Sequence, residues 1–213
     1  MTRGVGDVVM VETLADAWER WGRRCAGLTA AQWRARTRCE GWDVRSLVAH
    51  VCPEVTTFES LAAATVSGDA AVTDAAQLLR IFNQPDGVAT TTAGRIAERA
   101  ATEATALTPE DAANRFAECA RRVRAMPEMT RPRDTVIRYP VVGSTTLAVV
   151  AEVALMEATV HLLDLAAAVG GVEPSGAALT ATRDLLVAVP DPVAIVEVLA
   201  GRREPAAAVP AIH

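Results

Sequence analysis

The strongest constraint on this chain is an apolar run, residues 147–169, that contains no glycine or proline. As a helix the run would make about six turns, and Gly170-Gly171 directly after it would end that helix. It carries four ionisable side chains that would be costly in lipid: Glu152, Glu157, His161 and Asp164. We therefore predict a buried central helix, capped by Ser144 or Thr145, rather than a membrane span.

The rest of the chain is suited to helices that pack around this run. Hydrophobic residues make up 51% of the sequence, and much of this content is alanine and leucine, which are strong helix formers. Long alternating patterns of the kind that predict strands are absent from the sequence. A length of 213 residues suits one domain. The prediction is an all-α fold, a four-helix bundle with a long connection between its second and third helices and extra short C-terminal helices.

Apolar periodicity places the main helices of the bundle at residues 8–26, 43–66, 108–126 and 146–169. Asp43 and Thr108 stand where side chains cap helix N-termini. Pro53 would kink or restart the second helix because it lacks a backbone donor. Shorter helices are expected at residues 75–82, 92–106, 176–188 and 192–200.

Two further assignments complete the organisation of the chain. Residues 127–143 are rich in proline and glycine, so we expect a loop with a short extended piece at Val136-Ile137. Residues 1–201 are assigned to the bundle and residues 202–213 to a tail. Bulky core positions are expected for the four tryptophans, which all lie in the first fifth of the chain: Trp18, Trp21, Trp33 and Trp42.

Charge and cysteine content exclude several classes of function. The net charge is -5, and the basic residues, all arginines, form no stripe of the kind that binds nucleic acid. The four cysteines are spread without a Cys-x-x-Cys pair, which does not indicate a disulfide framework. The N-terminus lacks a basic segment followed by an apolar signal core. We expect a cytoplasmic protein without nucleic-acid or membrane partners.

Within the central run, the candidate functional residues are Glu157 and His161. Residues four apart share one face of a helix. Of the three histidines, His213 is the last residue, which leaves His50, at the end of an apolar helical stretch, as the other internal imidazole. Two imidazoles and one carboxylate are the ligand set of an open catalytic zinc-type site. A lone Glu-x-x-x-His is also common as a surface ion pair, which is the alternative interpretation.

A metal ion would also explain a carboxylate in an apolar run. A buried Glu157 costs several kcal/mol, roughly, unless it is paired or bound to a cation. Bound water or a bound thiol would lose its proton near neutral pH and become a nucleophile. Asp164, one turn beyond His161, is placed to accept an imidazole N–H or to act as a general base.

Two stretches of the sequence resemble a known family. Trp33 and residues 37–50 are similar to the N-terminal signature of the mycothiol-dependent maleylpyruvate isomerase family, a group in the DinB-like superfamily of four-helix metalloproteins. The second signature is matched by Glu157, His161, Asp164, Leu165, Ala168 and Gly170. The resemblance covers about residues 8–201. It implies that His50, Glu157 and His161 are the metal ligands, that the metal is zinc, and that mycothiol is the co-substrate whose sulfur reaches the metal.

The sequence also departs from the family pattern. Ala154 stands where the family often has an arginine, and Pro53 after His50 is unusual. We expect the separate C-terminal domain of the isomerase to be absent, so its substrate is not carried over. Three arginines could bind a carboxylate: Arg80, Arg95 and Arg138. The default expectation for each of them is an ordinary surface side chain.

These observations lead to one functional prediction and two alternatives. The prediction is a zinc-dependent enzyme that activates mycothiol for transfer to, or isomerisation of, a small electrophile. The first alternative is a metal-dependent cyclase or hydrolase that uses no thiol. The second is a non-catalytic small-molecule binding protein of the same fold.

Overall fold

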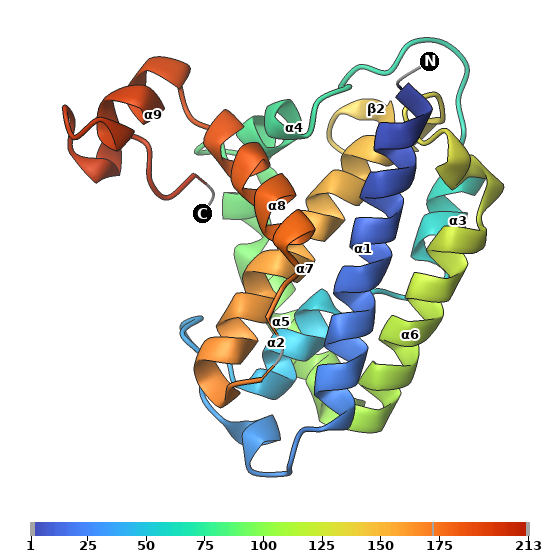
Figure 1. Ribbon diagram of the computed structural model, residues 1–213, viewed down its shortest axis with the longest axis vertical. Helices are drawn as coiled ribbons and strands as arrows, with labels where there is room; N and C mark the ends of the chain where they lie inside the picture. Colours follow the sequence, from blue (N-terminus) through green and yellow to red (C-terminus); the bar gives the residue numbers. More distant parts are fainter. Residues whose placement is uncertain (1–2, 172, 212–213) are drawn as a thin grey trace.

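The protein is all-α apart from one small hairpin, as the sequence predicts. The structure, a computed structural model, describes residues 3–171 and 173–211 (Figure 1). Val172 and His213 lie outside the described residues, so the expectation for the terminal histidine is not addressed. None of the helices described is long and apolar enough to cross a membrane.

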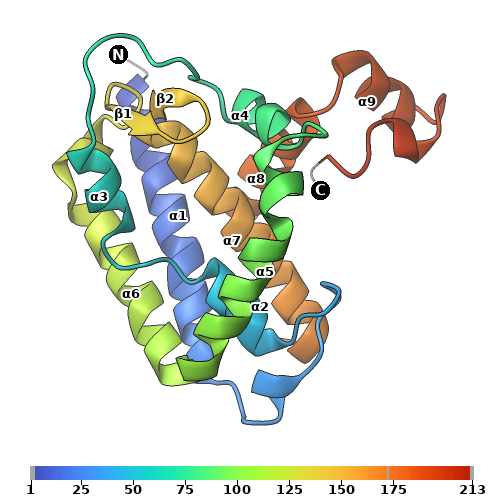
Figure 2. The same cartoon turned by 180° about the vertical axis from the view of Figure 1, so that it is seen from behind.

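Four long helices form the body of the molecule. They are α1 (Arg3–Ala26), α5 (Val88–Ala106), α6 (Pro109–Ala125) and α7 (Leu147–Val169). α1 packs on both α6 and α7, and the short α2 (Val44–Val51) packs between α5 and α7 (Figure 2). The central apolar run is therefore enclosed by α1 on one side and α2 on another.

The second predicted helix is split, and this changes which segments build the bundle. α2 ends at Val51 and a separate helix, α3 (Thr57–Ala63), follows Pro53. Proline restarts the helix here because its missing N–H cannot continue the ladder. The predicted long connection contains α4 (Ala75–Phe82), at the expected residues, and α5, which begins at Val88 rather than at residue 92 and is long enough to join the bundle.

Trp21 fixes the position of α7 against α1. Its side chain is fully buried, stacks on Phe116 of α6 with ring centroids 5.4 Å apart, and donates from Nε1 to the carbonyl oxygen of Ala158 at 2.8 Å. Gly22 lets α1 and α6 approach closely, since a Cβ there would lie 3.1 Å from the carbonyl oxygen of Ala113. The predicted core positions of Trp18 and Trp33 are confirmed as well.

Helix caps agree with the sequence at two positions and differ at a third. Asp43 accepts from the Ser46 amide at 2.8 Å, and Thr108 forms a capping box at the start of α6. The cap of α7 is Thr146, not Ser144 or Thr145. The reason is that residues 143–146 form a strand, β2 (Gly143–Thr146), which pairs antiparallel with β1 (Val136–Tyr139). The extended piece predicted at Val136-Ile137 is thereby confirmed.

The remaining elements cover the ends of the bundle. They include α8 (Gly176–Ala188), which packs on α7, α1 and α4, and α9 (Pro192–Leu199). α9 packs with the short 3-10 helix η3 (Pro205–Ala207) and stands away from the long helices (Figure 1). Two other 3-10 helices are η1 (Gln32–Arg34) and η2 (Pro127–Thr130). The division of the chain at residue 201 stays a prediction.

Candidate metal centre

The predicted ligands come from two helices that pack on each other. α7 carries Glu157 and His161 on one face, one turn apart, and α2 carries His50 in its last turn. The aspartate cap at Asp43 and the stop at Pro53 together limit α2 to two turns, with the imidazole near its end. The structure thus brings the three side chains together from positions more than a hundred residues apart.

The spacing of their donor atoms is that of ligands to one ion. Oε2 of Glu157 lies 3.3 Å from Nε2 of His161 and 3.7 Å from Nε2 of His50. Charge-assisted hydrogen bonds are shorter, about 2.7–2.9 Å. Neighbouring ligands of a tetrahedral zinc, with bonds of about 2.0–2.2 Å, are about 3.3–3.6 Å apart. One donor atom from each residue lies within 4.8 Å of the others, so the donor set fits a divalent ion.

Asp164 forms a hydrogen bond with the imidazole of His161 that fixes the orientation of the ring. Its Oδ2 lies 2.7 Å from Nδ1 of His161, a normal hydrogen-bond distance. A proton on Nδ1 shared with this carboxylate leaves the lone pair of Nε2 facing Glu157. The structure therefore places Asp164 behind the imidazole, in agreement with the predicted support of an imidazole N–H.

A family model matches most of the chain. The family pattern of the mycothiol maleylpyruvate isomerase N-terminal domain matches residues 14–166. The chain belongs to this family. The match runs from within α1 to residue 166 of α7, so it includes all three predicted ligands, and it confirms the family resemblance found in the sequence signatures.

The other two comparisons add no relative. No curated protein matches the chain. No solved structure matches it. The family assignment supports a mycothiol-related protein of DinB-like type, and the described residues include groups that suit a metal ion.

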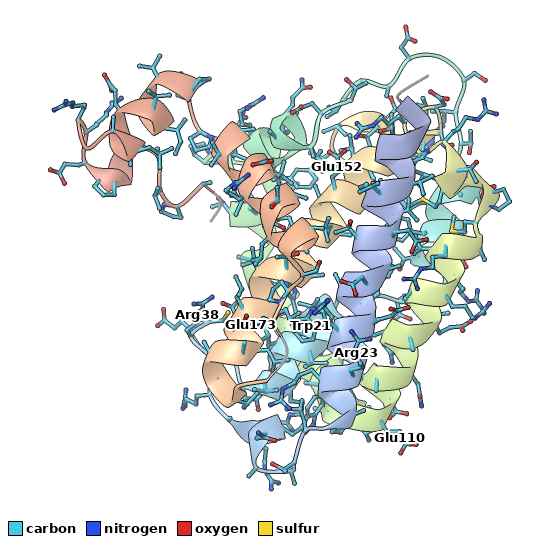
Figure 3. All side chains as sticks on the ribbon, in the orientation of Figure 1. Trp21, Arg23, Arg38, Glu110, Glu152 and Glu173 are labelled. Atoms are coloured by element: carbon cyan, nitrogen blue, oxygen red, sulfur yellow. The ribbon has the colours of Figure 1, made fainter. Side chains whose placement is uncertain are left out.

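Two residues of the family's N-terminal signature reach Asp164, which sequence reasoning missed. Nε of Arg38 donates to Oδ1 of Asp164, and Sγ of Cys39 lies 3.4 Å from Oδ2 (Figure 3 labels Arg38 beside the C-terminal half of α7). The sequence placed both in a loop and gave them no role. Their only signal was membership of the same signature as His50.

Cys39, His161 and Asp164 form a second group whose donor atoms lie within 4.8 Å of one another. Arg38 already occupies one oxygen of Asp164, and Nδ1 of His161 already bonds the other. A guanidinium at this position opposes a second cation. This group is therefore better suited to supporting His161 than to holding a metal itself.

Trp42 is not simply a core residue, in contrast to our expectation. It is half-buried, and its ring centroid lies 4.8 Å from that of His50 and 6.4 Å from that of His161. The two imidazoles are 5.1 Å apart and nearly perpendicular. Trp42 therefore contacts the proposed ligands and covers one side of the centre.

The charged groups of the centre stabilise one another. Burial alone would raise the pKa of Glu157, but the polar contacts and charges of His161 and His50 outweigh it and lower the pKa to about 2. Burial would lower the pKa of His161, yet Asp164 and Glu157 raise it to about 9. Burial would raise the pKa of Asp164, which His161 and Arg38 instead lower to about 2. The two carboxylates thus favour positive charge beside Nε2 of His161.

The side chains of the centre are partly exposed to solvent, although the sequence placed them in an apolar run. The exposed fractions of the side chains are 17% for His161, 24% for His50 and 39% for Glu157. His50 and Pro53 also line a cavity of about 320 Å³, with Ile96 and Arg99 of α5 on its far side. This cavity therefore gives small molecules access to His50, whereas Glu157 and His161 do not line it.

The arginines considered as anion ligands do not join the centre. Arg80 donates to the carbonyl oxygen of Ala188 at 2.7 Å, which explains its position. Arg95 and Arg138 are exposed, in agreement with the default expectation. Ala154, the departure from the family pattern, is half-buried one turn before Glu157.

Proposed function

We propose that this protein is an enzyme that uses a divalent metal ion, with zinc as the first candidate, to activate mycothiol. His50, Glu157 and His161 would hold the ion. The activated thiol would be transferred to a small electrophile or would isomerise it by reversible addition. The convergence of two Nε2 atoms on one oxygen of Glu157, at 3.3 and 3.7 Å, is the observation that carries this proposal.

The chemistry needed from the ion is simple. A bound divalent cation supplies positive charge that deprotonates a coordinated thiol at neutral pH. Two neutral imidazoles and one carboxylate leave a net charge of about +1 at such a centre and at least one open position. Mycothiol is the thiol that the family name specifies.

The protein's own side chains would orient and protect this centre. Asp164 would accept a hydrogen bond from Nδ1–H and so keep Nε2 of His161 directed toward Glu157, while Arg38 holds Asp164. Trp42 excludes water from one side of the imidazoles. The cavity beside His50, of about 320 Å³, is where we expect the electrophile to approach.

The test is thiol transfer to a generic electrophile. Zinc-loaded protein, mycothiol and monochlorobimane are incubated together, and the conjugate is quantified by mass spectrometry. We expect formation above the rate with chelator-treated protein, and loss of the excess in Glu157→Gln. Glu98→Gln, the same chemical change at an exposed position on α5, is the matched control.

Two results would redirect the assignment. Metal-dependent chemistry without any thiol dependence would favour the hydrolase or cyclase alternative. Purified protein that binds no divalent metal would contradict the whole proposal and favour a non-catalytic binding protein.

A further inference from the structure

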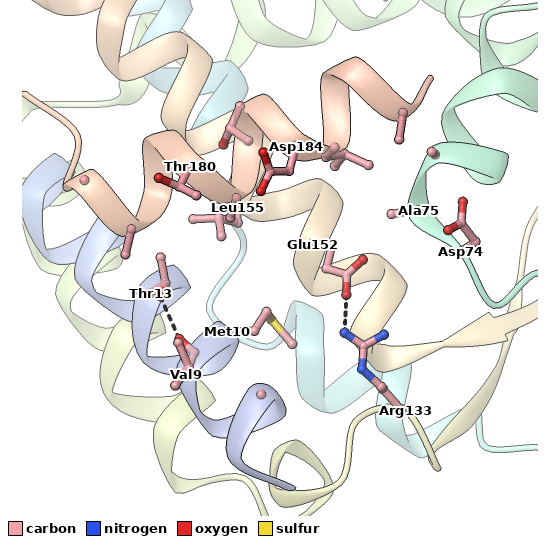
Figure 4. Close-up of a pocket in the computed structure, with 18 residues that line it drawn as sticks. Val9, Met10, Thr13, Asp74, Ala75, Arg133, Glu152, Leu155, Thr180 and Asp184 are labelled. Atoms are coloured by element: carbon pink, nitrogen blue, oxygen red, sulfur yellow. Dashed lines mark hydrogen bonds and ion pairs between the residues drawn. The ribbon is translucent and has the colours of Figure 1, made fainter. Parts of the chain in front are cut away.

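A second, larger cavity lies on the opposite face of α7. Its volume is about 720 Å³, and α1, α4, α7 and α8 enclose it (Figure 4). His161 lies nine positions after Glu152, which lines the cavity. At about 100° per residue the two side chains are therefore on opposite sides of the helix. We call it the α8 cavity. Its size is typical of small-molecule sites, about 300–1,000 Å³.

Most of its wall is apolar. Met10 of α1, Leu155 of α7 and Leu185 of α8 line it, and alanines of α8 keep the interior wide. Ala177 and Ala181 line the cavity and are also exposed, so the space is reachable from solvent. The cavity therefore suits an apolar group that enters beside α8.

The charges on the wall are unbalanced. Arg133 is the cation of the lining, and it is shared: Nη2 lies 2.7 Å from Glu152 and Nε lies 2.8 Å from the buried Asp7. Two more carboxylates line the cavity, those of Asp74 and Asp184. Figure 4 shows Glu152 of α7 between Asp184 and Arg133. Arg133 serves both Glu152 and Asp7, whereas Asp184 has its own partner, Arg183, at 2.7 Å. The carboxylate of Asp74 accepts from the amide of Gln77 but has no guanidinium partner among the ion pairs of the described residues. Positive charge beside the cavity is therefore scarcer than negative charge, chiefly around Glu152.

Glu152 responds to this imbalance. Burial is the main cause that raises its pKa, Asp74 and Asp7 raise it further, and Arg133 opposes the rise. The positive charge of Arg133 therefore does not fully offset the effect of burial on this carboxylate. A further cation beside it would be stabilised.

One polar group of the wall lacks a partner. Thr182 of α8 lines the cavity and is 6% exposed. Its hydroxyl oxygen has no hydrogen-bond partner within the described part of the chain. Buried hydroxyls are normally hydrogen-bonded, so this group is suited to a ligand that brings N–H donors.

We propose that the α8 cavity binds a small organic cation with an apolar body, such as a primary cycloalkylammonium ion. The ammonium group would donate to Glu152 and Thr182, and the apolar body would contact Met10, Leu155 and the alanines of α8. A carboxylate or phosphate ligand is disfavoured by the surrounding acids. This site is separate from the proposed metal centre and does not depend on the proposed function.

The test compares three ligands that share one body. Cyclohexylmethylamine, cyclohexylmethanol and cyclohexanecarboxylate are titrated into the full chain by calorimetry, with and without a metal chelator. We expect the amine to bind about tenfold more tightly than the alcohol, the carboxylate to bind most weakly, and the chelator to have no effect. Glu152→Gln should remove the preference for the amine, whereas Glu98→Gln on α5 should keep it.

A second variant keeps the proposal testable if Glu152→Gln fails to fold. Ala181→Phe fills the cavity from the exposed side of α8 and should weaken binding of both the amine and the alcohol. Equal affinity for amine and alcohol, undetectable amine binding, or loss of binding with chelator would overturn the proposal. A change in oligomeric state in Ala181→Phe with unchanged amine affinity would also overturn it, because the face would then be an interface between copies.

Discussion

Glu157 and Glu152 lie five residues apart in one helix, yet their surroundings shift their pKa values in opposite directions. Two imidazoles outweigh burial at Glu157 and lower its pKa to about 2. At Glu152 burial prevails, because Arg133 is shared with Asp7, and the pKa is raised. The difference teaches that the partners on neighbouring segments, not the position in an apolar helix, decide the charge state that a half-buried carboxylate favours.

The two faces of α7 differ in a second way. On the face that carries the proposed ligands, which we call the metal face, Asp164 is hydrogen-bonded to His161. Aromatic rings lie close to the imidazoles there. On the cavity face the partners are few and the space is wide. Changes on one face should therefore leave the other intact, and the following predictions test this separation.

The largest expected effect is loss of metal. His50→Ala or His161→Ala removes one of three donors, so we expect stoichiometric zinc in the parent protein and almost none in either variant after dialysis. Metal content by plasma mass spectrometry is the measurement. Arg133→Gln, on the cavity face, should retain the metal. Equal metal in all variants would contradict the ligand assignment.

Support of His161 should have a smaller effect than the ligands themselves. Asp164→Asn keeps the shape but loses the charge that holds Nδ1–H, so metal affinity should fall by roughly 10–100-fold. Competition with a coloured chelator measures this affinity. An unchanged affinity would show that the contact at 2.7 Å does not orient the ligand.

On the cavity face, loss of the Arg133 ion pairs should lower the free energy of unfolding. Arg133→Gln leaves Asp7, which is 5% exposed, without its guanidinium, and we expect the free energy of unfolding to fall by about 1–3 kcal/mol. Urea denaturation gives this value. Arg183→Gln breaks an exposed pair with Asp184 and should cost about 0–1 kcal/mol. A smaller loss in Arg133→Gln than in Arg183→Gln would refute the argument.

The smallest effect concerns thiol reactivity beside the metal face. Cys39 is half-exposed, whereas Cys25, Cys52 and Cys119 are buried. Burial raises the pKa of Cys25 and Cys119 to about 12 each, so neither is nucleophilic at neutral pH. Titration of the native protein with Ellman's reagent should show one thiol reacting first, and Cys39→Ser should remove it.

The pH dependence of this reaction has a definite sign. Burial and Asp164 raise the pKa of Cys39 above its usual 9.0. Its thiolate fraction, and so its rate, should still be rising between about pH 8 and about pH 9. A rate that levels off below about pH 8 would show that Arg38 dominates instead.

Much of the fold and the convergence of the site were predictable because they rest on local patterns. Periodicity and the caps at Asp43 and Thr108 located helices, and helical spacing put Glu157, His161 and Asp164 on one face. With so few histidines, His50 was the natural third donor, and the structure brings it to the pair. That these side chains bind a metal stays a prediction.

Other features depended on contacts between distant segments. Thr146 replaces the predicted cap because β2 pairs with β1, which no local signal near residue 144 reveals. Arg38 and Cys39 lie in an irregular loop, whose course has no periodicity to read. The α8 cavity exists only because four helices leave space between them, and sequence spacing within one helix does not report that space.

The loop before α2 forms the surroundings of the proposed ligands, and it can change independently of them. Arg38, Cys39 and Trp42 all come from that loop, whereas the proposed ligands come from rigid helices. Loops accept substitutions and insertions more readily than packed helices do. A change in this one short segment would therefore alter the surroundings of His50 and His161 while the helices that supply the donor atoms stay in place.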